Sequence, residues 1–388
     1  MISASFNFIN SIIGSGIIGL PYALNQAGLP FGLLLLVIVG FITDYSIILL
    51  IKGGNMSGTN SYQSLVQSTF GFPGFLILSG LQFLYPFIAM ISYNITTGDT
   101  LTKVFQRIPG VGPDHILAER HFVILLSTLA FTLPLSLYRN IEKLGKVKNA
   151  WAFAKWNAIQ AVAIMSFAFI CHHNSFLIYG SLQQPTIANW SRVTHLSVGS
   201  ALIVSAAFAV AGYTTFTGYT QGDIFENYCR NDNLATFGRF CFGLSIITTF
   251  PLECFVTREV VSNVIFSRDL SKAEHAAITL LIIAVCTSMS LAFDCLGVVL
   301  ELNGVVSATP LIFIIPSACF LKLSTGRWFQ TENLIPIILI IIGFFVMITG
   351  LIMTGLYPQD CSHGVEMFYC ADANVSVTVP SLQLTLPL

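Results

Sequence analysis

Ten stretches of about twenty mostly apolar residues occupy most of this chain, and the first is interrupted at Gly14-Ser15-Gly16. A helix of this length can cross a bilayer and satisfies its own backbone hydrogen bonds. Irregular backbone at membrane depth therefore persists only where it is buried in protein or lines a cavity. The interruption predicts a binding site for an ion or a small polar solute.

The composition excludes a water-soluble globule. Only 9% of the 388 residues are charged, whereas soluble domains carry about 25%, and the mean hydropathy is +0.78. A net charge of −1 gives no electrostatic reason to expect a nucleic-acid partner. Ten spans and their loops use nearly the whole length, so we expect a single all-α, multi-pass integral membrane domain without a separate soluble part.

Charge on the loops allows a test of topology, because short cytoplasmic loops collect Lys and Arg. The densest basic cluster, at 139–157, places the N-terminus in the cytoplasm, and the basic loop at 98–120 then falls outside. If the later spans alternate sides from this point, the later basic loops fall outside and the C-terminal tail falls inside, against the charge rule. One further crossing, missing from this chain between Gly145 and Lys155, would restore the agreement between loop charge and topology. The expected spans are 4–26, 31–51, 74–97, 121–138, 158–180, 194–216, 235–257, 276–298, 303–321 and 334–356.

The break in the first span has the chemistry of a binding site. Glycines on both sides of a serine let the backbone leave helical geometry at small steric cost. The freed amides at the start of the following half-helix suit a carboxylate, so we expect Gly14, Ser15 and Gly16 to bind substrate. The side-chain oxygen of Asn10 and the carbonyl near Ile13 are expected sodium ligands. The alternative is that these small residues only permit close helix packing.

A second polar cluster lies inside a span, at residues 166–174. Polar side chains at membrane depth are costly unless they face a cavity or a partner, so we expect Phe169, Cys171 and His172 to contribute to the substrate site. Adjacent residues of a helix point in different directions. Cys171, His172 and His173 therefore cannot converge on one metal ion, and no metal beyond sodium is expected.

Other polar groups within spans leave two alternatives open. The hydroxyls of Thr248 and Thr249 can complete a sodium shell, or they can simply bond back to the preceding turn, as is common in membrane helices. Asp44 and Glu253 are acids that can serve as proton sites. No nucleophile–base set is visible, so the chain is not expected to be an enzyme, and no cofactor is expected apart from the co-transported ion.

The C-terminal tail has features of an extracellular or lumenal segment. Cys361 and Cys370 lie in polar sequence, and Asn374-Val375-Ser376 is an N-glycosylation sequon. Disulfides persist in oxidising compartments. We therefore expect a Cys361–Cys370 disulfide and glycosylation at Asn374.

Three motifs in order resemble the sodium-coupled neutral amino acid transporters of the amino acid/auxin permease group: Asn10 with Gly14–Tyr22, Phe167–His172 and Leu311–Leu323. The resemblance implies eleven spans, the first ten forming two inverted five-helix repeats whose broken first helices hold substrate and sodium near the midplane. It assigns Asn10 and Thr249 to the sodium site.

This chain departs from that pattern after Lys143–Val147, where family members have a fifth span. Here the sequence continues directly into Lys148, which agrees with the topology conflict found from the loop charges. The resemblance therefore divides the domain into first-repeat helices at 1–147, second-repeat helices at 148–332, and a last span with a tail at 333–388. A splice variant or an incomplete gene model fits the departure.

These observations predict secondary active transport: sodium symport of a neutral amino acid by alternating access. One charge crossing about 100 mV contributes roughly 2.3 kcal/mol, which is sufficient in size to drive uptake. We expect a monomer in the plasma membrane or an endolysosomal membrane. The alternatives are a non-transporting amino acid sensor, an inactive splice variant, or a proton-coupled carrier using Asp44 or Glu253.

Overall fold

The computed structural model describes most of the chain between residues 14 and 356. The described residues are 14–108, 157–229, 231–266, 270–293, 295–324 and 331–356, with 5, 8, 9, 12, 110, 111, 115–129, 268, 367 and 370. Asn10, Ile13, Cys361, Asn374, the side chain of Ser15 and the position of the expected missing crossing lie outside this set.

The described residues form helices and connecting turns, without a strand, which confirms the all-α membrane fold. Eight helical segments are long and apolar enough to cross a membrane. The expected spans 4–26 and 121–138 are only partly described. The helices are α2 Leu20–Ala27, α3 Leu29–Ser57, α4 Tyr62–Phe105, α5 Arg120–Ser127, α7 Ala158–Phe169, α8 His172–Gly180, α9 Ile187–Phe216, α10 Asn233–Val261, α11 Lys272–Ala292, α12 Leu296–Asn303, α13 Ile315–Leu323 and α14 Thr331–Leu356.

Local sequence signals set where several of these helices begin. The Ser61 hydroxyl accepts a hydrogen bond from the Ser64 amide at the start of α4. At the start of α11, the Ser271 hydroxyl accepts from the Glu274 amide and the Glu274 carboxylate accepts from the Ser271 amide. Such capping boxes satisfy amides that the helix itself leaves free. Gly58, at a φ of 68° that favours glycine, ends α3.

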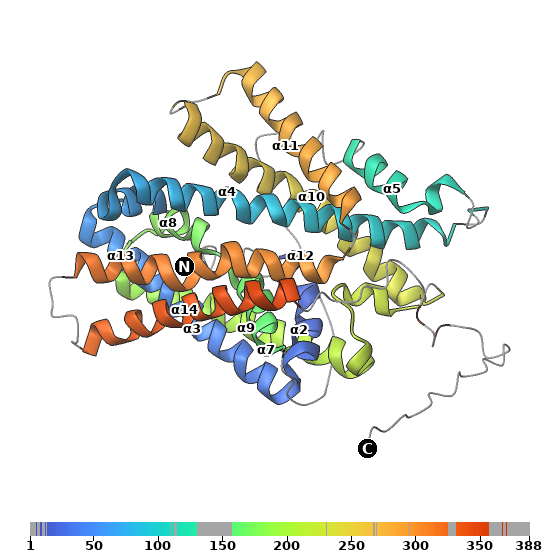
Figure 1. The fold of residues 1–388 in the computed structure, drawn as a ribbon, viewed down its shortest axis with the longest axis horizontal. Helices are drawn as coiled ribbons and strands as arrows, with labels where there is room; N and C mark the ends of the chain where they lie inside the picture. The colour runs from blue at the N-terminus through green and yellow to red at the C-terminus, as the bar shows by residue number, and fades with distance from the viewer. Residues whose placement is uncertain are drawn as a thin grey trace.

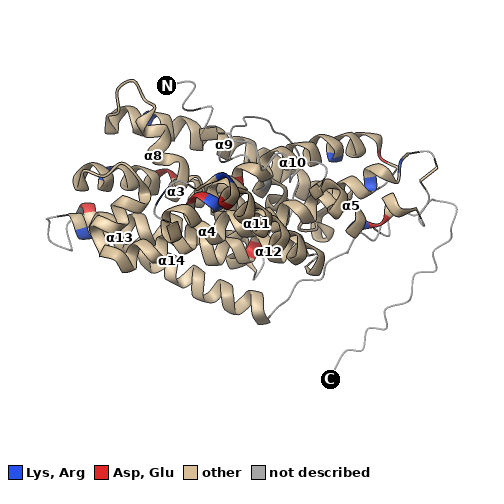
Figure 2. Ribbon diagram, turned by 90° about the horizontal axis from the view of Figure 1, so that it is seen from above, with Lys and Arg blue, Asp and Glu red and all other residues tan. Residues whose placement is uncertain are grey.

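The helices lie largely along the long axis of the molecule (Figure 1). Helix α4 packs against α10 and α11, α3 packs against α9 and α13, and α2 packs against α7 and α9. Charged residues are sparse along the ribbon (Figure 2). Large apolar side chains remain exposed on the flanks, for example Ile341 and Phe345 of α14, as a lipid-facing surface requires.

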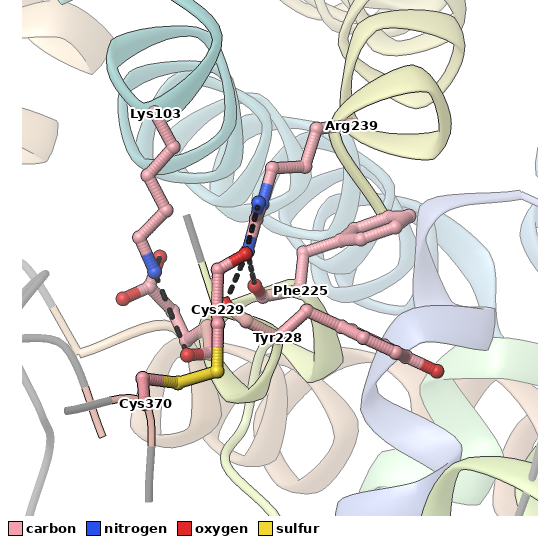
Figure 3. Close-up of a disulfide and its surroundings, with 7 residues drawn as sticks. Lys103, Phe225, Tyr228, Cys229, Arg239 and Cys370 are labelled. Carbon is pink, nitrogen blue, oxygen red and sulfur yellow. Dashed lines mark hydrogen bonds and ion pairs between the residues drawn. A yellow bond between two sulfur atoms is a disulfide. The ribbon is translucent and has the colours of Figure 1, made fainter. Parts of the chain in front are cut away.

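The two ends of the bundle differ. The outer end holds a disulfide between Cys229 and Cys370, with Cα atoms 5.3 Å apart (Figure 3). Since disulfides persist in oxidising compartments, this end faces the lumen or the cell exterior. The inner end holds residues 58–61, the end of α8 and the connection between α10 and α11, which line one cavity.

The expected Cys361–Cys370 disulfide is wrong. Cys370 bonds instead to Cys229, 141 positions earlier in the chain, because the fold brings the segment before α10 beside the tail. Cys295 is also disulfide-bonded, to a partner outside the described residues. Spacing along a sequence does not fix disulfide connectivity, and here proximity in sequence was misleading.

Helices α5 and α7 both begin at the outer end. Arg120, the first residue of α5, pairs with Asp99 near the end of α4. Asn157, just before α7, donates to Gln26 of α2 at 2.6 Å. Successive spans normally begin on opposite sides of the membrane, whereas these two described helices begin on the same side.

Close contact between backbones gives a stability prediction. A Cβ atom at Gly304 would overlap the carbonyl oxygen of Ala163, whereas nothing lies within 4 Å of a Cβ at Gly199. We expect Gly304→Ala to lower the free energy of unfolding by about 1–3 kcal/mol, because the α7 backbone must shift. Thermal unfolding of detergent-solubilised protein measures this effect. Gly199→Ala is the control, and an equal loss in both variants would contradict the packing argument.

Candidate substrate site

The first interrupted segment is non-helical where the sequence predicts it. Gly14 has extended backbone, with φ −105° and ψ −155°, and a 3₁₀ turn at Ser15–Gly19 (η1) follows before α2 begins. The Ile17 amide donates to the Gly14 carbonyl at 3.3 Å, a three-residue closure in place of the α-helical four. The backbone groups at this point therefore depart from the regular ladder.

A second break divides α7 from α8. Helix α7 ends at Phe169, Ile170 is extended with ψ 122°, and Cys171 has φ −145° before α8 begins at His172. This break falls inside the polar cluster that the sequence places at 166–174. Both flanking segments are largely buried.

The two breaks lie against each other. A Cβ atom at Gly16 would be 2.7 Å from the Cα of Ala168, and one at Gly19 would be 3.2 Å from Ile164. Glycine is required at Gly16 because only hydrogen fits between the two backbones. The structure thus brings the predicted substrate residue Gly16 against the end of α7, two residues before Ile170 of the second break.

A cavity of about 840 Å³ opens at the inner end and leads toward the second break. This volume is within the range of about 300–1,000 Å³ for small-molecule sites. Its mouth is formed by the α3–α4 connection, α8 and the end of α10. A much smaller pocket of about 10 Å³, the deep pocket, shares Tyr62, Gln82 and His173 with this cavity and is also lined by Tyr85, His172, Val256 and Leu311.

Of the three residues predicted around the second break, one lines the deep pocket. His172 is at its wall, while the side chains of Phe169 and Cys171 are fully buried outside the lining of this cavity. The ring of Tyr85 lies 5.6 Å from His173 and 5.8 Å from Phe167. Aromatic faces thus form a wall between the pocket and the break.

Polar contacts fix the deep wall. The His172 Nε2 atom is 3.0 Å from the Ser46 hydroxyl, which in turn donates to the Ile312 carbonyl. The Tyr62 hydroxyl donates to the Leu311 carbonyl at 3.0 Å. These carbonyls belong to a π-helical turn at Pro310–Ile314 (η8), a widened geometry that is frequent at functional sites.

The residues that form this wall of the deep pocket were not predicted from the sequence. Ser46, Tyr62 and Tyr85 lie in three different helical turns of α3 and α4 and share no spacing that marks a site. One signal was available: Tyr85 precedes Pro86, and a proline inside a span loosens the helix there.

The expected sodium ligands are only partly described. The Thr249 hydroxyl donates to the Ser245 carbonyl at 2.8 Å, and the Thr248 hydroxyl donates to the carbonyls of Leu244 and Ser245. A donating hydroxyl keeps its oxygen lone pairs, so back-bonding leaves both threonines able to ligate a cation. Because Asn10 and Ile13 lie outside the described residues, this sodium set stays a prediction.

The two acids considered for proton coupling have separate partners. The Asp44 carboxylate is 2.6 Å from Nδ1 of His195 on α9, and Glu253 accepts from the Tyr93 hydroxyl at 3.2 Å. Neither acid lines the cavity at the inner end.

Comparison with known proteins gives the family. A family model described as transmembrane amino acid transporter protein matches residues 1–149 and 146–356. A relative from Danio rerio, named "Putative sodium-coupled neutral amino acid transporter 11", is 68% identical over 97% of this chain and 91% of its own length. The protein of that name from Bos taurus is 57% identical over 100% of this chain and 90% of its own length.

A more distant relative is vacuolar amino acid transporter 2 of Saccharomyces cerevisiae, 30% identical over 93% of this chain and 84% of its own length. The Bos taurus alignment has 418 positions and this chain has 388 residues, so at least 30 aligned positions hold no residue of this chain. With its long apolar helices and paired helix breaks, the chain belongs to the transmembrane amino acid transporter family, as a multi-pass membrane protein and not an enzyme.

Proposed function

We propose that this protein carries a neutral amino acid across the membrane together with sodium, by alternating access. The observation that supports this most directly is the contact between the two helix breaks, beside a cavity that opens at the inner end. Backbone groups of both breaks, which lie outside the regular helical hydrogen-bond pattern, can bind a zwitterion there. The amide-rich start of the half-helix after Gly14 suits the carboxylate.

The residues that line the deep pocket, which itself has a volume of only about 10 Å³, favour a substrate with an uncharged side chain. Its lining contains Tyr, Gln, His, Val and Leu residues, and no Asp, Glu, Lys or Arg of the described chain is among them. A charged substrate side chain would be desolvated there without an ionic partner, at a cost of several kcal/mol. Tyr85, Gln82 and His172 can instead offer hydrogen bonds to a polar, neutral side chain.

Sodium coupling follows from the oxygen ligands that the two regions offer. In this proposal the carbonyl near Ile13, the Asn10 side chain and the hydroxyls of Thr248 and Thr249 would supply the neutral oxygens of the sodium site. A bound cation beside the substrate carboxylate would stabilise it, and by linkage the substrate would tighten cation binding equally. The relatives' names support this proposal for sodium and neutral amino acids.

The second candidate function, a variant that does not transport, has its own supporting observations. The Bos taurus alignment contains at least 30 positions without a residue of this chain. The family model matches in two parts that overlap at residues 146–149, within the region where the sequence analysis expects a missing crossing. About thirty residues are enough for one helical span and a loop, and α5 and α7 begin on the same side. A transport assay separates the two functions.

The first prediction of this function concerns sodium. In proteoliposomes, uptake of alanine or glutamine should require sodium, and Asn10→Ala should reduce it about tenfold or more, which corresponds to about 1.4 kcal/mol of lost binding. Asn189→Ala, at the exposed start of α9, is the control and should keep wild-type uptake. Uptake that follows pH and ignores sodium would point to proton coupling, and Asp44 and Glu253 would then be tested. No uptake by correctly inserted protein would support the non-transporting variant.

The second prediction concerns the contact between the breaks. Gly16→Ala places a methyl group against the Ala168 backbone and should separate the two breaks, so substrate affinity and uptake should fall at least about tenfold. Scintillation-proximity binding and uptake measure the two effects. Gly80→Ala on α4, where nothing lies within 4 Å of the added carbon, should change neither. Equal activity of both variants would show that the contact is not part of the site.

A further inference from the structure

A cluster of charged side chains is buried at the outer end, away from the cavity. The Lys103 Nζ atom is 2.8 Å from the Glu226 carboxylate, and Arg120 pairs with Asp99. Asp223 lies beside them. The exposed fractions of Asp223, Lys103 and Glu226 are 3%, 4% and 7%. Buried charges are costly unless they are paired and hydrogen-bonded, so this cluster requires a physical reason.

Charges do not balance among the members of this cluster that the structure describes. There, two cations, Lys103 and Arg120, face three carboxylates: Asp99, Glu226 and Asp223. One Asp223 oxygen accepts from the Phe225 amide at 2.8 Å. Its other oxygen, Oδ2, is buried and has no hydrogen-bond partner among the described residues, and the same holds for Oε2 of Glu226.

The groups facing Asp223 come from two elements. Asp99 and Lys103 approach from α4, and Glu226 approaches from the 3₁₀ turn Ile224–Asn227 (η5). Arg239 of α10 does not supply the missing positive partner, because its guanidinium donates to the backbone carbonyls of the segment around Tyr228 (Figure 3).

We propose that the Asp223 carboxyl binds a proton from the outer compartment, and that this proton holds the outer segment, residues 217–229, closed against α4. A protonated carboxyl removes the excess negative charge and supplies a donor to the neighbouring Glu226 oxygen. The ligand is a proton, and it reaches the site from the lumenal or extracellular side, where the Cys229–Cys370 disulfide places this end.

The outer segment also contacts the first broken helix. The Asn25 side-chain amide of α2 donates to the carbonyls of Gly218 and Thr220 at 3.3 and 3.1 Å. A Cβ atom at Gly222 would lie 2.5 Å from the Gly297 amide nitrogen of α12. Closing the segment therefore fixes α2, the outer half of the helix that carries the Gly14–Gly16 break. Protonation of Asp223 is thereby coupled to the conformation of that half-helix.

Burial, the Glu226 charge and the Asp99 charge raise the pKa of Asp223 to about 8, from an ordinary value of 3.8. Because the pKa of Asp223 is raised in the folded, closed state, protonation of Asp223 stabilises that state. This contribution is complete below about pH 3.8, declines through the interval between the two values, and is lost as the pH rises through about 8. Within that interval the closing equilibrium changes up to tenfold per pH unit.

Infrared spectroscopy of the full chain in sodium-free nanodiscs tests the proton directly and needs no transport activity. Wild-type protein should show the carbonyl stretch of a buried protonated carboxyl at pH 6, titrating away with a midpoint near pH 8. Asp223→Asn should remove the component of the band that titrates near pH 8, in the difference between the wild-type and variant spectra. A wild-type spectrum without this component, or the same component surviving in Asp223→Asn, would overturn the proposal. Loss of the band on adding sodium at constant pH would assign the site to sodium instead.

Thermal unfolding against pH provides the second readout. Wild-type stability should fall between pH 6 and pH 9, whereas Asp223→Asn, which imitates the protonated side chain, should remove that part of the pH dependence. Asp232→Asn is the matched control: Asp232 caps α10 through the Ala235 amide, a bond that asparagine also makes, so it should follow wild type. Identical profiles for all three proteins would contradict the proposal, while failed uptake alone would bear only on the proposed transport function.

Discussion

Two unwound segments inside a membrane protein have to be shielded from lipid, and here each shields the other. Gly16 lies against the backbone of Ala168, so at this contact each segment covers the other. The rest of the bundle accommodates this contact. Gly304 approaches the α7 backbone on its other side, and Leu300 of α12 closes over Gly19. The small residues at these helix contacts therefore allow both the close packing of the helices and the contact between the broken segments. Close packing and formation of a binding site are not competing explanations for them.

The two ends of the molecule use different polar chemistry. The inner cavity is lined mainly by neutral polar and aromatic groups, which water can solvate without breaking ion pairs. At the outer end, Lys103 and Arg120 are each paired with a carboxylate. Those pairs explain why the basic loop at 98–120 can lie outside although positive charge usually collects on the cytoplasmic side.

Features carried by one segment could be predicted from sequence, and features made between segments could not. Glycines around Ser15 predict the first break, and polar residues at 166–174 indicate the second, because each signal is local. The Lys103–Glu226 pair joins residues far apart in the chain, and Cys229 finds Cys370 only after the bundle forms. Periodicity reports the environment of one helix and carries no information about which helices meet, so the tail disulfide was assigned to the wrong partner.

The buried pairs at the outer end also bear on the alternating access proposed for this protein. Coulombic attraction between Lys103 and Glu226 is strong only while the site excludes water, since a higher dielectric weakens it severalfold. Once the outer segment moves and water enters, both ions are solvated and little attraction remains to pull it back. Such an arrangement favours two states, fully closed or fully open, over intermediate ones. Because Asn25 links the outer segment to α2, a movement of this segment would also move the half-helix that follows the first break, as the proposed alternating access requires.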